Sequence, residues 1–546
     1  MDPVAELRAA VAEAAGTLAG GEQRLPGLER PPKPDFGDYS TNAAMLLAPV
    51  MSEPPRGVAE KLGELLGERL AGVLERVEVA GPGFLNLFVS DEWLRSALAG
   101  MVAAEDGYGG GVASEAERVL VEFVSANPTG PVTVASGRHA AYGDSLARIL
   151  DFAGHDVERE FYVNDYGSQM RRLGESIKAR ARGEEPPTDG YHGGYVTELA
   201  EKIDGAAESD VDELATQSAT LILESVEATL ERFRVHFDRF FSERSLHEAD
   251  KLRAVLTLLE EKELAYPSEG AVWMRTTEYG DDKDRVLMRS NGEMTYFTAD
   301  IAYHRDKLER GYDRAIDVLG ADHHGHVTRM LAAWDLLGGE GGTLELPIMQ
   351  IVSLMEGGQR VQMSKRGGEF VTLDELIDDI GVDAARFFLL QRSHDTALDL
   401  DLSLARDRSQ DNPVYYLQYA HARIASILRK AGSEAVDAAT AADLAGSAEH
   451  LHASACALLK RLLEWPAEVL EAADRRAPHR ITVYLHVLAQ DFTAFYRDVK
   501  VVGAAEEGGD EAFRIAMCVA TRRVLARGLD LLGVEAPEEM HRDDAA

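Results

Sequence analysis

Three polar side chains of different chemistry lie close together at Glu122, Ser125 and Asn127. They stand at the end of an apolar segment, residues 119–124, and a turn rich in proline and glycine follows them. Open α/β sheets bind ligands at the carboxyl ends of their strands, so these side chains are placed to contact a cationic substrate with an α-amino group. Considered by spacing alone, helix capping is the simpler explanation of Ser125 and Asn127.

A phenol and a carboxylate, Tyr296 and Asp300, are four residues apart. On a helix this spacing brings two side chains onto one face. An acid next to a phenol suits a guanidinium group, which prefers planar acceptors that take two hydrogen bonds. The alternative is a solvated helix start without a ligand, and the spacing alone favours that alternative.

Three histidines and an aspartate fall within residues 322–326. Such a cluster is typical of metal ligands, but no matching ligand set stands elsewhere in the sequence. We therefore predict no metal here. Because the cluster follows a predicted strand, we expect His323 and His326 to contact a substrate or a nucleotide.

A lysine and an arginine lie between serine and glycine in residues 362–368. A cationic loop of this kind can close on a polyphosphate and stabilise charge that develops during phosphoryl or nucleotidyl transfer. A basic surface loop without a ligand explains this segment equally well when it is taken alone.

Alternating strands and helices must position these four groups. Residues 119–124 are predicted to be a strand buried on both faces, residues 137–153 the helix after it, and residues 314–319 and 346–352 further strands of the same parallel sheet. Strand, loop and helix in this order begin a doubly wound, Rossmann-like nucleotide-binding fold. A charged and mainly helical stretch at about 183–290 is predicted to be an insertion in that domain.

Two regions flank the α/β domain, which we place at residues 113–411. Residues 1–112 combine helical patterns with a short strand and predict a small α+β domain, whose last glycines, 107–111, are interpreted as a linker. Residues 412–546 are almost entirely helix-periodic and predict an all-α bundle. The fold class is therefore multidomain α/β.

Acidic residues dominate the charge of the chain. It has 94 Asp and Glu against 57 Lys and Arg, a formal net charge of −37, and only 12 of the basic residues are lysine. Nucleic-acid-binding proteins ordinarily lean basic, so this charge argues against such a partner. At molar salt, however, the Debye length falls to roughly 3 Å, and a dispersed acidic surface keeps a protein solvated. We therefore predict a halophilic protein.

Neither a membrane partner nor a disulfide framework is expected. The apolar runs are far shorter than the roughly 20 residues that span a bilayer, and the N-terminus lacks the features of a secretory signal. Cys456 and Cys518 are the only cysteines and are interpreted as buried thiols. These features predict a cytoplasmic protein.

Taken in order, the segments resemble a class I aminoacyl-tRNA synthetase, and specifically the arginyl-tRNA synthetase family. Residues 362–366 resemble the KMSKS loop, with Met363, Ser364 and Lys365 kept, and the segment that follows Pro131 stands where the family has its HIGH motif. Further segments typical of this one synthetase lie at residues 37–42, 80–84, 161–167, 189–193 and 412–423. The resemblance covers nearly the whole chain.

The resemblance implies the ligation of L-arginine to tRNA(Arg) through arginyl-adenylate, with ATP as a substrate and Mg²⁺ shielding its phosphates. It implies that arginine is held by Glu122, Ser125, Asn127, Tyr296, Asp300, His323 and His326. ATP would be bound by Pro131, Gly137, Met363, Ser364 and Lys365, with Lys365 neutralising the phosphates during transfer. The resemblance also implies that the N-terminal domain contacts the tRNA, that the helical bundle reads the anticodon, and that the protein is a monomer.

The sequence departs from the family at the HIGH motif, whose two histidines are replaced by Thr133 and Ser136. Both hydroxyls can still donate hydrogen bonds, so they are the candidate catalytic residues beside Lys365, with Arg138 or His139 as compensating groups. Losing a transition-state donor can lower a rate by about 10² to 10³. A tRNA- or arginine-binding paralogue without adenylation is therefore one alternative. Another adenylate-forming ligase, with a pocket for lysine, is a second, because carboxylates bind both cations.

Overall fold

The computed structural model describes residues 2–21, 27–31, 33–361, 371–446 and 450–540. Met363, Ser364 and Lys365, which were predicted to contact ATP, lie outside these ranges. Within them, no helix is both long enough and apolar enough to cross a bilayer.

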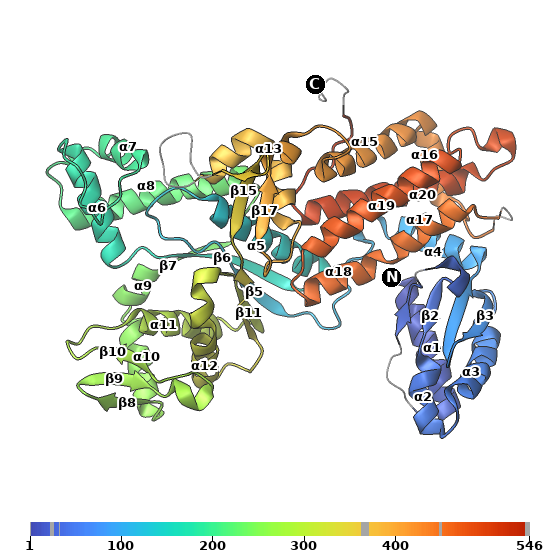
Figure 1. The fold of residues 1–546 in the computed structure, drawn as a ribbon, viewed down its shortest axis with the longest axis horizontal. Helices are drawn as coiled ribbons and strands as arrows, with labels where there is room; N and C mark the ends of the chain where they lie inside the picture. The colour runs from blue at the N-terminus through green and yellow to red at the C-terminus, as the bar shows by residue number, and fades with distance from the viewer. Residues whose placement is uncertain (1, 22–26, 32, 362–370, 447–449, 541–546) are drawn as a thin grey trace.

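A five-stranded parallel sheet lies at the centre of the molecule, with the strand order β13-β11-β5-β6-β7 (Figure 1). Its strands are β5 (Arg118–Glu122), β6 (Asp156–Val163), β7 (Arg239–Ser242), β11 (Arg314–Asp317) and β13 (Leu344–Glu345). Register places Glu122 opposite Glu160 on one side and Asp317 on the other. Three carboxylates therefore stand in a row near the carboxyl ends of adjacent strands, and the predicted doubly wound parallel sheet is confirmed.

Two helices connect the sheet to the residues predicted to do chemistry. Helix α5 (Val134–Ala153) follows β5 and packs against α13 (Leu373–Leu390) and α18 (Trp465–Asp474). Helix α11 (Tyr296–Glu309) precedes β11 in the chain.

The predicted helical insertion at about 183–290 is wrong in part. Its helices, α7 (Gly194–Lys202) and α8 (Val211–Arg232), pack with α6 (Ser168–Ala181). Strand β7, however, pairs with β6 and is an edge strand of the central sheet. Only four residues long and half-exposed, β7 has no run of buried apolar residues that would reveal it.

A small unit with its own hydrophobic core follows β7 in the chain. It contains α9 (Glu243–Glu248), α10 (Lys251–Glu261), α11, α12 (Val327–Leu337) and the antiparallel strands β8 (Ala265–Ser268), β9 (Ala271–Met274) and β10 (Arg285–Met288). It lies at the lower left of Figure 1, below the central sheet.

The predicted strand at residues 346–352 is also divided. Strand β14 (Ile348–Met349) pairs with β12 (Leu319–Gly320), whereas β15 (Val352–Glu356) joins β16 (Gln359–Arg360) and β17 (Leu398–Asp401) in a separate sheet. Pro347 precedes β14, and proline cannot donate a hydrogen bond to a continuous ladder.

The N-terminal region is the predicted α+β domain. Its sheet has the order β1-β2-β4-β3. The elements are α1 (Pro3–Ala19), β1 (Leu28–Glu29), β2 (Tyr39–Thr41), α2 (Ala43–Met51), α3 (Pro55–Arg69), β3 (Leu74–Ala80) and β4 (Phe84–Val89). Helix α4 (Asp91–Ala103) then leaves this domain and packs against α17 and α20 of the bundle described next.

Helices make up the C-terminal region, which confirms the predicted all-α bundle. They are α15 (Pro413–Ala431), α16 (Ser433–Ala441), α17 (Ala453–Leu463), α18, α19 (His479–Asp498) and α20 (Glu511–Leu531). Helices α17 and α18 are separate although only Glu464 lies between them, and Pro466 occupies the first turn of α18.

Part of the segment interpreted as a linker, Tyr108 and Gly109, is buried against this bundle. The Tyr108 hydroxyl donates to the Leu462 carbonyl at 3.0 Å, and the Trp465 indole donates to the Tyr108 carbonyl at 3.1 Å. Gly109 has φ +85°, and a Cβ there would lie 2.3 Å from the Trp465 ring. The glycine thus allows a close approach between domains that the sequence pattern did not reveal.

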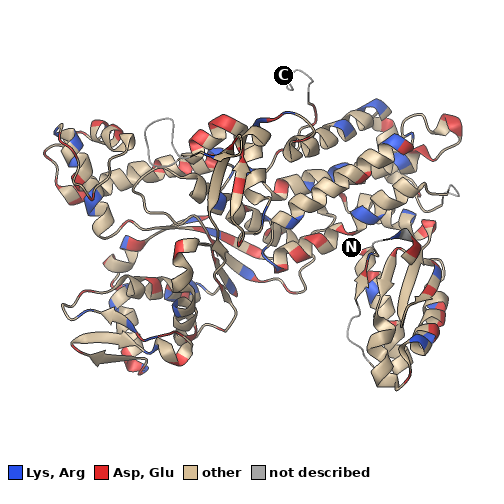
Figure 2. Cartoon of the chain, viewed as in Figure 1, with Lys and Arg blue, Asp and Glu red and all other residues tan. Residues whose placement is uncertain are grey.

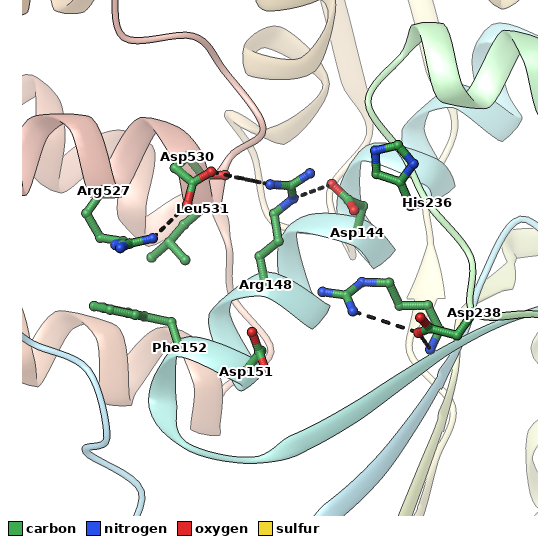
Figure 3. Close-up of a pocket in the computed structure, with 10 residues that line it drawn as sticks. Asp144, Arg148, Asp151, Phe152, His236, Asp238, Arg527, Asp530 and Leu531 are labelled. Carbon is green, nitrogen blue, oxygen red and sulfur yellow. Dashed lines mark hydrogen bonds and ion pairs between the residues drawn. The ribbon is translucent and has the colours of Figure 1, made fainter. Parts of the chain in front are cut away.

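A buried ion pair joins α13, α5 and the end of α20. Arg386 is fully buried and donates to Asp144 at 2.5 Å, and also to the carbonyls of Leu532 and Phe233 at 2.8 and 2.9 Å. A polar cavity of about 340 Å³ lies beside this joint (Figure 3). Along its wall, Arg148 contacts both Asp144 and Asp530, at 2.8 and 3.5 Å, which links α5 to α20.

Residues 532–539, which we call the C-terminal strap, continue from α20 along α13 and α15. Three backbone carbonyls of the strap are bound by side chains. Arg234 donates to the Gly533 carbonyl at 3.0 Å, and Gln418 donates to the Glu535 carbonyl at 3.0 Å. Nδ1 of His421 lies 2.8 Å from the Pro537 carbonyl. Because the backbone N–H of Glu535 also donates to Asp383 at 3.0 Å, the strap connects the bundle to α13.

Candidate active site

The chain turns sharply after β5. Val124 has φ +68° and Ser125 has φ +40°, and a β-branched residue in the left-handed region is uncommon and strained. The turn brings the Ser125 hydroxyl to Oε1 of Glu122, to which it donates at 2.7 Å, while the backbone N–H of Tyr162 donates to the same hydroxyl at 3.3 Å. The strained turn thus brings together Glu122 and Ser125, two residues predicted to contact a substrate.

Glu122 is buried and held at both oxygens. Lys307 Nζ donates to its Oε2 at 2.5 Å and to Oδ1 of Asp317 at 2.7 Å. Burial raises the pKa of Glu122, and Lys307 opposes this effect. Burial would also raise the pKa of Asp317, but Lys307 and His304 lower it to about 2.

Two further carboxylates lie beside Glu122. Burial raises the pKa of Asp300, and the charge of Glu122 adds to the effect. Burial raises the pKa of Glu243 to about 7, a shift that Tyr162 opposes and that the charge of Asp300 increases. Among the described residues, the Asp300 carboxylate has no hydrogen-bond partner. Glu122, Asp300 and Glu243 therefore form an acidic site that can accept a cation.

Glu243 is a site residue that was not predicted from the sequence. It is the first residue of α9 and directly follows β7, so it stands at the same carboxyl edge of the sheet as Glu122. Recognising residues 239–242 as a sheet strand would have pointed to it, since ligand-binding residues follow parallel strands at this edge.

Tyr296 and Asp300 share helix α11 one turn apart, as predicted. Tyr296 is 63% exposed and approaches the loop at Gly167, where a Cβ would lie 3.8 Å from the phenol oxygen. Asn127 lies near the same loop, because its side chain donates to that of Gln169, two residues after Gly167, at 2.6 Å. Tyr296 thus stands on the solvent side of Asp300.

Thr133 and Ser136 begin helix α5. The Thr133 hydroxyl oxygen accepts from the Ser136 backbone N–H at 3.2 Å, and the two hydroxyl oxygens are 3.2 Å apart. They line a cavity of about 280 Å³ together with Asn127 and Pro131. Gly137 is instead buried against Leu373, where a Cβ would come within 2.8 Å of a methyl group.

The two compensating groups considered for the HIGH motif differ in position. Arg138 donates to the carbonyls of Gln350, Ser393 and Thr396 at 2.7 to 2.9 Å, so its guanidinium is committed to the fold and that expectation is wrong. His139 lies beside Gly320, where a Cβ would be 3.7 Å from the ring. Burial lowers the pKa of His139 to about 4, so its imidazole is neutral.

The histidine-rich segment forms a short 3₁₀ helix, Ala321–His326, next to His139. His323 is exposed and lies 3.4 Å from Asp322, and its ring centroid is 5.2 Å from that of His326. Burial, with the charge of Arg329, lowers the pKa of His326 to about 4. The structure therefore groups His323 and His326 with His139.

Comparison with known proteins places each region of the chain. Residues 5–89 match the family model described as the arginyl tRNA synthetase N terminal domain. Residues 100–401 match the class I (R) tRNA synthetase catalytic domain, and residues 417–540 match the DALR anticodon binding domain.

Individual relatives match along nearly their full length. The arginine–tRNA ligase of Frankia alni is 46% identical over 94% of both chains, and that of Bacillus subtilis is 43% identical over 98% of both. The arginyl-tRNA synthetase structure from Thermus thermophilus aligns with a TM-score of 0.77 and 25% identity, covering 98% of this chain and 99% of that one. The motifs, the three domain matches and these relatives agree, and the chain belongs to the arginyl-tRNA synthetase family.

Proposed function

We propose that this protein ligates L-arginine to tRNA(Arg). The arginine carboxylate attacks the α-phosphorus of ATP, which enters with Mg²⁺, and forms arginyl-adenylate as pyrophosphate leaves. A terminal ribose hydroxyl of the tRNA then attacks the arginyl carbonyl and AMP leaves. The observation that carries this proposal is the acidic site formed by Glu122, Glu243 and Asp300 in a chain whose relatives are named arginine–tRNA ligases.

The acidic site accounts for the two cationic ends of arginine. Asp300 and Glu243 are placed to bind the guanidinium, with Tyr296 covering it from the solvent side. Glu122, Ser125 and Asn127 are placed at the α-amino end. This arrangement directs the amino acid's carboxylate towards the start of α5, where ATP is proposed to bind.

Arginine use is expected to depend on pH through Glu243, whose pKa burial raises to about 7. Below this value the carboxyl is mostly neutral and attracts a guanidinium weakly, so kcat/KM for arginine should fall about tenfold per pH unit as the pH drops. The profile should be measured in wild type and in Glu243→Gln. An acidic limb that stays unchanged in Glu243→Gln would assign it to another group.

The nucleotide is proposed to contact Thr133 and Ser136, with His323 and His326 at the adjoining edge of the pocket. The Thr133 oxygen accepts a backbone N–H, and its hydroxyl can donate a hydrogen bond to the Ser136 oxygen, which leaves the Ser136 hydroxyl able to donate to a phosphate. Pro131 and Gly137 shape this end of α5. Met363, Ser364 and Lys365 are proposed to contact the ATP phosphates, with Lys365 supplying the positive charge.

Replacing Ser136 by alanine is expected to lower kcat for adenylate formation by about 10², the lower end for loss of one transition-state donor. Ser136→Thr retains the hydroxyl and should recover most of the rate. The measurement is pyrophosphate exchange at saturating ATP and arginine. Equal rates for the alanine and threonine variants would remove the hydroxyl from the mechanism.

Arginine-dependent ATP–pyrophosphate exchange, with and without tRNA(Arg), tests the whole proposal. Lysine in place of arginine tests the alternative pocket. The replacement of both HIGH histidines favours the binding-only alternative, which predicts that folded protein binds tRNA or arginine and shows no exchange under any condition.

The remaining assignments follow from the same proposal. Residues 1–112 would contact the tRNA, residues 113–411 would hold the chemistry, and residues 412–546 would read the anticodon. We further propose a cytoplasmic monomer adapted to high salt. Figure 2 supports the last point, since Asp and Glu are spread over every part of the chain. Exchange activity that peaks at low salt and falls in molar KCl would contradict it.

A further inference from the structure

One face of helix α11 carries a row of polar side chains towards the sheet. Asp300, His304 and Lys307 are spaced by four and three residues, which brings them onto one side of the helix. The Lys307 side chain is 0% exposed. A fully buried lysine is rare unless its charge is paired, so this residue needs an explanation beyond solvation of the helix.

Lys307 contacts two carboxylates, Glu122 of the acidic site and Asp317 of the neighbouring strand, and His304 contacts the second of them. Lys307 contacts Glu122 at 2.5 Å and Asp317 at 2.7 Å, and Nε2 of His304 lies 3.0 Å from the other Asp317 oxygen. Nδ1 of His304 lies 2.8 Å from the carbonyl of Asp300. Lys307 therefore lies between Glu122 and Asp317, whereas the Asp300 carboxylate has no hydrogen-bond partner among the described residues.

The same contacts fix the rotation of the Glu122 carboxylate. Oε1 accepts the Ser125 hydroxyl at 2.7 Å and Oε2 accepts Lys307. A guanidinium clamp pairs the charge of one carboxylate with two parallel acceptor positions, whereas here the Lys307 ammonium already pairs with that charge and one of the two lone pairs on each oxygen is filled. A single N–H of an ammonium group needs only one remaining lone pair.

We propose that Lys307 is a positioning residue that sets the direction in which arginine binds. By pairing with Oε2 of Glu122, it leaves that carboxylate suited to accept one N–H of the α-ammonium and poorly suited to clamp the guanidinium, which is directed to Asp300 and Glu243. This inference rests on the proposed function, and it concerns a residue that does not itself touch the substrate.

The test compares the binding of L-arginine with that of 5-guanidinopentanoate, which lacks the α-amino group, by calorimetry. Wild type should prefer arginine by about 10- to 100-fold, the value of one charge-assisted hydrogen bond. In Lys307→Met the preference should shrink to about threefold or less. A merely structural role would weaken both ligands alike and leave the ratio unchanged, and that result would overturn the proposal.

Two further variants complete the design. Lys251→Met removes a half-exposed lysine that pairs with Glu309 and should leave the ratio at the wild-type value. Lys307→Leu also removes the donor to Glu122 and carries the same test if the methionine variant does not fold. Absence of pyrophosphate exchange in wild type would reject the proposed function, whereas an unchanged binding ratio rejects only the role of Lys307.

Discussion

Asp300→Asn is expected to lower kcat/KM for arginine by about 10² to 10³ while KM for ATP changes little. The variant keeps the shape of the side chain and removes the charge that faces the guanidinium. Loss of one partner of a buried charge pair costs roughly 3 to 4 kcal/mol, and each 1.36 kcal/mol corresponds to about a tenfold change in rate. Pyrophosphate exchange at varied arginine and at varied ATP measures both parameters.

A matched control lies on the same helix. Glu309→Gln also removes one carboxylate from α11, but Glu309 is exposed and pairs with Arg305 and Lys251 at the surface. Its kinetics should stay within about twofold of wild type, because exposed ion pairs contribute little. An Asp300→Asn variant that behaves like this control would mean that the guanidinium binds elsewhere.

Arg386→Met is expected to destabilise the protein by about 3 to 5 kcal/mol. The change leaves Asp144 buried without its strongest partner, and removing one member of a buried ion pair has a cost of this order. It also leaves the carbonyls of Leu532 and Phe233 without their donor. Thermal and urea unfolding of both proteins at equal concentration measure the difference.

Arg406→Met is the control for this effect. Arg406 pairs with Asp379 and Glu356 at 2.6 Å, but at a partly exposed site, where a pair contributes about 1 kcal/mol or less. Two variants with the same unfolding midpoint would contradict the assignment of Arg386 as the buried joint between domains.

Local patterns predicted the parts of the site that depend on neighbours in sequence. The apolar run before Glu122 indicated a buried strand, and the four-residue spacing of Tyr296 and Asp300 indicated one face of a helix. Both follow from geometry that repeats every few residues. The parallel sheet and the helical bundle could be predicted for the same reason.

Long-range contacts account for what the sequence did not reveal. By sequence alone, Lys307 looks like a solvated residue of a helix. In the fold, β5 and β11 bring Glu122 and Asp317 into contact with it. By sequence alone, Gly109 looks like part of a linker. In the fold, Trp465, more than 350 positions later in the chain, packs on its backbone. Glu243 follows a strand too short to give a periodic signal. In each case the partner is set by the topology of the sheet or the packing of domains, which local propensity does not encode.

The C-terminal strap has a consequence for how the chain folds as it is made. Arg386 donates a hydrogen bond to the carbonyl of Leu532, which lies 146 residues later in the chain. Translation proceeds at about 5 to 20 residues per second. The Leu532 carbonyl is therefore synthesised roughly 7 to 30 s after Arg386, and until then Arg386 lacks this hydrogen-bond acceptor. During that interval Arg386 can already pair with Asp144 but lacks the Leu532 carbonyl, so the partly made protein has a weaker joint than the finished one and is more open to proteases.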